Sequence, residues 1–80
     1  MESNVFRGQD TYGKQIEVAV NQEGQWFFRH YRYNGYGMAW SKWEKLNEPR
    51  QPFVNEIGKE VIRWGWNELI GFKAKRKLPI

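Results

Sequence analysis

Residues 15–46, QIEVAVNQEGQWFFRHYRYNGYGMAWSKWEKL, decide the fold. From Gln15 to Val20, β-branched residues alternate with polar or small ones, which is the two-residue period of a strand with one buried face. The next four residues, Asn21-Gln22-Glu23-Gly24, predict a three-residue hairpin loop with Gly24 in the left-handed conformation that lacks a Cβ penalty. The stretch therefore predicts an antiparallel hairpin.

Closing this hairpin on Asn21 and Gln25 fixes the register of both strands. One face becomes apolar, and the other carries an opposite-charge pair across the strands. The predicted pairs are Val20–Trp26, Val18–Phe28 and Ile16–His30 on the buried face, and Ala19–Phe27, Glu17–Arg29 and Gln15–Tyr31 on the outer face.

A second hairpin is predicted at Asn34-Gly35, because this dipeptide suits the two positive-φ positions of a type I′ turn. The resulting pairs are Tyr33–Tyr36, Tyr31–Met38, Arg29–Trp40 and Phe27–Lys42. The same register places Gly37, Ala39, Ser41 and Trp43 on the buried side. Because three of these four side chains are small, they leave room for a helix against the sheet.

Residues 53–70 are the predicted helix, since apolar side chains recur there at helical spacing after Pro52. Gly58 and Gly65 oppose a helix, and residues 61–66 suit a strand as well. The predicted fold class is α+β: a three- to four-stranded antiparallel sheet, a meander of hairpins, with one C-terminal helix packed on one face. Residues 5–12 are expected to add an edge strand.

The 80-residue chain predicts one compact domain over residues 1–72 and a basic, flexible tail over 73–80. There is no cysteine, no apolar run of membrane-spanning length and no secretory signal, so we expect a cytoplasmic protein without a membrane partner. The sequence leaves the oligomeric state open, a homodimer included.

Chemistry-bearing residues are sparse. His30 is the single histidine and Asp10 the single aspartate, and no paired carboxylates, metal-ligand spacing or phosphate-binding glycine loop is present. A contact between His30 and Ser41 would be the start of a catalytic pair, but a hydrogen-bonded histidine at the rim of the sheet is the favoured interpretation. We therefore predict no enzyme, no metal site and no cofactor.

Aromatic and basic residues are concentrated in the middle of the chain. Fourteen Trp, Phe and Tyr residues make up 18% of the sequence, and residues 25–50 carry five cations against two anions. Such a surface is either covered by other parts of the chain or used for binding. The predicted binding residues are Phe27, Arg29, Tyr31, Arg32, Tyr33, Tyr36, Trp40 and Lys42 on the sheet, with Lys73, Lys75, Arg76 and Lys77 in the tail.

Nucleic acid, DNA or RNA, is the favoured partner, because aromatic rings stack bases while cations meet phosphates. The alternative prediction is a protein-binding adaptor or inhibitor that uses the same aromatic surface. The layout of residues 15–65 resembles the small sheet-and-helix DNA-binding domains of some transposon and phage integrases, with Trp26, Arg29, Gly35 and Trp40 as the matching positions. That resemblance implies strands laid into a DNA groove.

Overall fold

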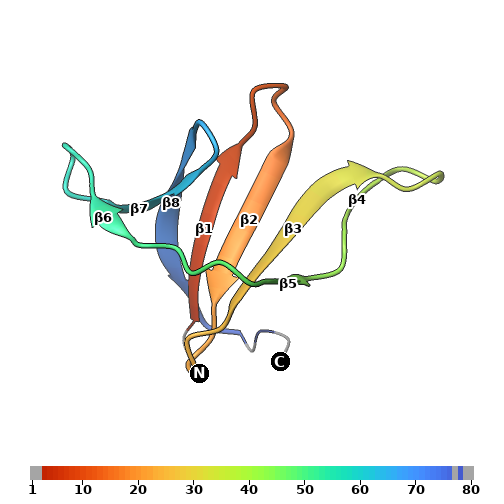
Figure 1. Cartoon of the computed structure of the whole chain (residues 1–80). Helices are drawn as coiled ribbons and strands as arrows, with labels where there is room; N and C mark the ends of the chain where they lie inside the picture. The colour runs from red at the N-terminus through yellow and green to blue at the C-terminus, as the bar shows by residue number, and fades with distance from the viewer. Residues whose placement is uncertain (1–2, 77, 79–80) are drawn as a thin grey trace.

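The computed structural model describes residues 3–76 and 78, which form one antiparallel sheet (Figure 1). Within this part of the chain there are eight strands and no helix. The strands are β1 (Ser3–Gln9), β2 (Gln15–Val20), β3 (Trp26–Tyr33), β4 (Met38–Trp40), β5 (Glu44–Leu46), β6 (Phe53–Val54), β7 (Glu60–Trp64) and β8 (Asn67–Ala74).

The first strand lies in the middle of the sheet, in the order β4-β3-β2-β1-β8-β7-β6. β5 also pairs with β3, at the other end of that strand from β4. The prediction of an edge strand at residues 5–12 was therefore wrong. β1 has β2 on one side and β8 on the other, so the first and last strands are neighbours. Long-range pairing of this kind has no local sequence signal.

The first hairpin has the predicted register. Val20 pairs with Trp26, Val18 with Phe28 and Glu17 with Arg29. Gly24 has a φ of 81°, and the Asn21 side-chain Oδ1 accepts hydrogen bonds from the backbone N–H groups of Glu23 and Gln25. The predicted loop and both strand faces are thus confirmed.

The second hairpin forms with a register shifted by two residues. Tyr33 pairs with Met38 and Tyr31 with Trp40. A type I′ turn needs positive φ at both central residues, yet no described residue other than glycine has a positive φ, so Asn34 cannot take that role. Instead the backbone N–H of Asn34 donates to the Gly37 carbonyl, 3.0 Å away, and closes a four-residue loop. A shift of two keeps the β4 side chains on their predicted faces.

A bulge after Trp40 changes the face of the following residues. Tyr31 pairs with Trp40 in β4, and Phe28 pairs with Glu44 in β5. The segment from β4 to β5 therefore has one residue more than the part of β3 opposite it. The prediction that Trp43 lies beside the inner core is therefore wrong. Its side chain packs against the opposite face of the sheet.

The predicted C-terminal helix is absent, and the fold is all-β rather than α+β. Residues 53–70 form two hairpins, β6–β7 and β7–β8. Asn55 accepts hydrogen bonds from the N–H groups of Ile57 and Lys59, and Gly58 has a φ of 83°, as in the Asn21 loop. Gly65, with a φ of 59°, occupies the first central position of a two-residue turn, the arrangement of type II′. The two glycines that oppose a helix are thus hairpin residues.

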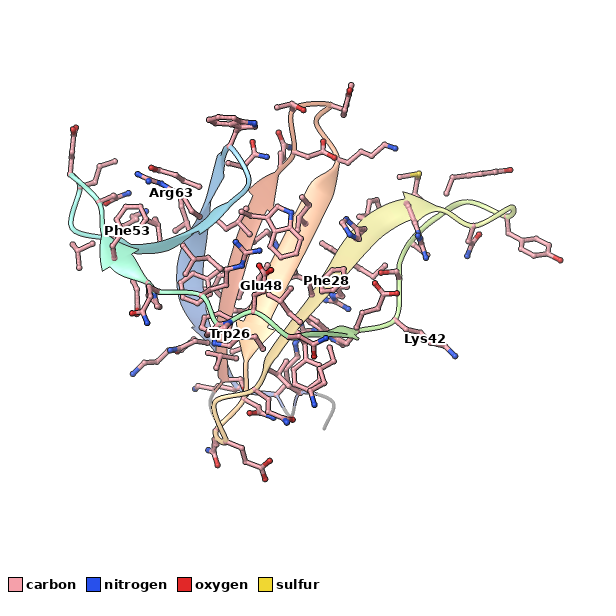
Figure 2. The ribbon with its side chains drawn as sticks, viewed as in Figure 1. Trp26, Phe28, Lys42, Glu48, Phe53 and Arg63 are labelled. Carbon is pink, nitrogen blue, oxygen red and sulfur yellow. The ribbon has the colours of Figure 1, made fainter. Side chains whose placement is uncertain are left out.

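The inner face of the sheet, defined by the side chains of Phe6, Val18 and Trp26, carries the main core. Its buried members are Phe6, Ile16, Val18, Trp26, Ile62 and Leu69, with Val20, Phe28, Leu46 and Trp64 packed against them. The segment between β5 and β6 crosses this face, and Trp26 and Phe28 lie beside it (Figures 1 and 2). At the other end of the crossing, the Arg50 guanidinium lies 4.7 Å from the Trp64 ring centroid.

Phe6 sits over a glycine that no other residue can replace without movement. Gly71 is its cross-strand partner in β8, and a Cβ on Gly71 would lie 2.3 Å from the Phe6 ring. The close approach lets the ring lie flat on the backbone, and the Phe6 side chain is fully buried.

A smaller apolar cluster lies on the opposite, outer face. Val5, Ala19 and Leu78 are buried there, and Trp43 and Ala74 pack against them. Lys73 and Ala74 belong to β8 and pair with β1, and Leu78 is only 5% exposed. The compact unit thus extends beyond residue 72, where we had predicted the start of a flexible tail. Leu78 packs in one cluster with Val5 and Ala19 and shields their side chains from water.

Candidate arginine and tryptophan site on the outer face

Glu17 is the centre of the outer face and is fully buried. The strand register places Arg7 of β1 and Arg29 of β3 directly across from it on either side. Arg7 donates to Oε2 from Nε and Nη2, at 3.1 and 2.8 Å, and Arg29 donates to Oε1 from the same two atoms. Charge-assisted hydrogen bonds of this kind offset part of the hydration that a buried carboxylate loses.

Two tryptophans cover this ion cluster. The Arg29 guanidinium carbon lies 4.4 Å from the Trp40 ring centroid and 4.5 Å from that of Trp43. Arg29 is accordingly held between two indoles, and its side chain is only 13% exposed. Cation–π attraction is strongest when the cation is desolvated in this way, so the rings and the ion pair fix one another.

Two further arginines form an accessible rim. Arg7 and Arg76 are about half exposed, at 50% and 51% of their side-chain surface, and Arg76 approaches Glu17 Oε1 at 4.0 Å. Glu17 is the one acidic side chain among the outward-facing residues of β1, β2 and β3. Three guanidinium groups thus surround a single carboxylate, which leaves an excess of positive charge at the surface.

Four of the predicted binding residues meet in or beside this cluster: Arg29, Tyr31, Trp40 and Arg76. The ring centroids of Tyr31 and Trp40 are 5.3 Å apart. Phe27 is on the same face but is buried, with 5% exposure, so it supports the cluster from below.

The other predicted residues lie apart. Tyr33 and Tyr36 are exposed at the far end of the β3–β4 hairpin, Arg32 lies on the opposite side of β3, and Lys42 is exposed in the bulge, where Figure 2 shows it directed away from the sheet. Lys73 alternates with Phe72 and so belongs to the inner side of β8. Lys75 is exposed near Arg76, and Lys77 lies outside the described residues.

Four members of the site are not among the predicted binding residues: Arg7, Glu17, Trp43 and Phe72. Glu17 was predicted to pair with Arg29, but nothing local reveals that β1 brings a second arginine to its other side. Arg7 lies 5.7 Å from the Trp40 ring centroid and 5.6 Å from that of Phe72. The alternation of Val5 and Arg7 places both side chains on one face of a strand, but it does not show which strands lie beside that strand.

A second feature is a hollow of about 430 Å³ between the segment that precedes β6 and the strands β6 and β7. It is lined by Pro49, Arg50, Gln51, Phe53 and Arg63. Figure 2 shows Phe53 and Arg63 close together, and their ring centroid and guanidinium carbon are 5.4 Å apart. Arg50 donates from Nη1 to the Arg63 carbonyl at 2.9 Å, which satisfies a strand edge that the short β6 leaves open. Arg50 therefore has a structural role there.

The remaining polar candidates do not assemble into a reactive group. The His30 backbone N–H donates to Ser41 Oγ at 3.0 Å, and the His30 ring packs edge-on against Phe28, 5.6 Å between centroids. Among residues 3–76 and 78, no three His, Asp or Glu side chains are grouped to hold a metal ion. In the same described ranges, no helix has the length and apolar character needed to cross a membrane.

Comparison with known proteins adds no family to this geometry. No family model matches the chain, and no curated protein or solved structure matches it either. The resemblance to integrase DNA-binding domains also loses its basis, because that layout requires a helix behind the sheet and the described chain has none.

Proposed function

We propose that the protein binds single-stranded nucleic acid on the outer face of its sheet. The observation that carries this proposal is the cluster of three arginines on one buried carboxylate, flanked by aromatic rings. Phosphates pair with guanidinium groups, and unpaired bases stack on rings and on guanidinium planes.

Accessible charge supports the proposal. Arg7 and Arg76 each keep about half of their side-chain surface open to solvent, and Lys45 and Lys75 are exposed nearby. Arg29, by contrast, is enclosed by Trp40 and Trp43, so it stabilises the surface and makes no phosphate contact itself. Phosphate contacts by the exposed cations would release counterions, and the affinity would then fall with salt.

Accessible rings support it further. Phe72 is 43% exposed beside Arg7, and Tyr31 borders Trp40. Stacking contributes about 1–3 kcal/mol per base and tolerates any sequence. Because duplex bases are already stacked on one another, these rings favour a single strand.

The direct test is a titration with mixed-sequence single- and double-stranded oligonucleotides at low salt. We expect the single strand to bind more tightly, and dissociation constants weaker than about 100 μM for both would rule out the proposal. Arg76→Ala is expected to reduce the salt slope by about 0.7, the value for one lost phosphate contact on a single strand. The matched control is Arg32→Ala, an exposed arginine on the opposite side of β3, which should leave the slope unchanged.

A protein partner is the second candidate, and the hairpin tips favour it. Trp66 is 96% exposed on the β7–β8 turn, and Tyr12 is 86% exposed on the β1–β2 turn. These two turns lie at the same end of neighbouring strands, as Figure 1 shows. Tryptophan and tyrosine are enriched where interfaces derive most of their binding energy. Under this alternative, Trp66→Ala abolishes binding and salt has little effect.

A further inference from the structure

A line of flat side chains crosses the outer face from β3 and β4 to β8. Tyr31 lies 5.3 Å from Trp40, Arg7 lies 5.7 Å from Trp40, and Arg7 lies 5.6 Å from Phe72. Each separation joins a ring centroid to the next ring centroid or guanidinium carbon. Both kinds of plane stack nucleobases, so the line is a continuous series of stacking surfaces rather than a set of isolated rings.

Resting on the function proposed above, we propose that the single strand runs along this line, across the strands of the sheet rather than parallel to them. Arg7 and Phe72 are then binding residues. From β4 to β8 the sheet has four strand spacings, a span of about 19 Å. This length fits about four nucleotides, the small end of the range that sheet-based single-strand sites cover.

Glu17 is the positioning residue of this path. It holds the Nε and Nη2 atoms of Arg7 on one carboxylate oxygen while the other oxygen holds Arg29. One edge of the Arg7 guanidinium is thereby fixed, and the group is held close to both Trp40 and Phe72. Glu17 engages Nε and Nη2, so Nη1 is the group placed to donate to a phosphate, and half of the Arg7 side chain remains exposed.

A path along β3 is the competing arrangement, and it makes a different prediction. It would follow Tyr31 to Tyr33, which is 68% exposed, and would leave Phe72 without a contact. Tyr33→Ala is therefore the matched counterpart of Phe72→Ala, since both remove an exposed ring from the same face of the sheet.

The experiment is a fluorescence-anisotropy titration with thymidine oligonucleotides of two to eight nucleotides. In the wild-type chain, affinity should rise with length up to about four nucleotides and then level off. Phe72→Ala should weaken binding of the tetranucleotide about 5- to 150-fold and level off at a shorter length, while Tyr33→Ala binds as the wild type does.

Arg7→Lys separates stacking from charge. Lysine keeps the positive charge but has no plane, so we expect weaker binding with an unchanged salt slope. A Phe72→Ala variant that binds like the wild type, or a Tyr33→Ala variant that loses as much affinity, would overturn the path while leaving nucleic-acid binding intact. If the wild-type chain binds no oligonucleotide of any length, the proposed function fails together with the path.

Discussion

The two faces of this sheet differ in the way their side chains are held. The inner face is a conventional apolar core in which Phe6, Val18 and Ile62 have no exposed surface. The outer face has an equally buried residue at its centre, but that residue is Glu17. Apolar burial stabilises a small domain directly, whereas a buried carboxylate must first recover the free energy of its lost hydration.

The ion cluster on the outer face is not the most stable way to close that face. A pair of apolar residues at positions 17 and 29 would close the outer face at least as stably as the ion cluster does. The cluster instead leaves two arginines half exposed and aromatic rings beside them. We therefore propose that folding depends mainly on the inner face and ligand recognition on the outer one.

Phe6→Ala should have the largest effect on stability, a loss of about 3–5 kcal/mol in the free energy of unfolding, because it empties a fully buried site at the centre of the sheet. Urea denaturation followed by tryptophan fluorescence measures it. Phe72→Ala, from the outer face, is the control and should cost about 1 kcal/mol or less, since its ring is 43% exposed. Equal losses would show that the two faces contribute alike.

Glu17→Ala comes next, with an expected loss of about 3 kcal/mol. It leaves Arg29 desolvated between two indoles without its counterion, while Arg7 and Arg76 can regain water and soften the effect. Glu44→Ala, at an exposed position on β5, is the matched control and should change stability by no more than about 0.5 kcal/mol. A Glu17→Ala variant as stable as this control would mean that the buried ion cluster does not form.

Leu78→Ala should destabilise the protein by about 2 kcal/mol, at the low end for a buried leucine because it sits at the margin of the sheet. Thermal unfolding of this variant, compared with Lys75→Ala, measures how firmly the C-terminal segment is docked. An unchanged midpoint for Leu78→Ala would show that this side chain contributes nothing to the outer-face apolar cluster.

Trp66→Ala should have the smallest effect on stability, within about 0.5 kcal/mol, because its ring is 96% exposed and contributes to neither face. Oligonucleotide affinity should also stay constant in this variant. Loss of oligonucleotide binding on removal of Trp66 would move the site from the outer face to the hairpin tips.

How far the sequence predicts this molecule depends on how local each decision is. The first hairpin was predictable because strict alternation and one left-handed glycine specify both register and face. The β6–β7 hairpin has the same loop pattern, Asn55-Glu56-Ile57-Gly58-Lys59 compared with Asn21-Gln22-Glu23-Gly24-Gln25. It was not predicted because the apolar residues around it recur at helical spacing.

The candidate site was predictable only in part, because it depends on pairing between distant strands. Glu17 with Arg29 follows from one hairpin, but Arg7 and Phe72 arrive through the contacts of β1 with β2 and β8. The position of Trp43 depends on a one-residue bulge, and no glycine, proline, asparagine or aspartate in residues 41–43 indicates it. Non-local pairing and bulges are decided by the packing of the whole sheet, which a single sequence does not display.

The five tryptophans offer the most direct test of ligand binding at the outer face, because their indole N–H signals report separately on each part of the surface. Trp40 and Trp43 cover the outer-face cluster, Trp26 and Trp64 lie on the inner face, and Trp66 stands at a hairpin tip. In a ¹H–¹⁵N correlation spectrum recorded during titration with a single-stranded thymidine oligonucleotide, we expect the Trp40 and Trp43 signals to shift in a saturable way while the other three stay in place. Shifts confined to Trp26 and Trp64, or to Trp66, with Trp40 and Trp43 unchanged, would contradict binding at the outer face.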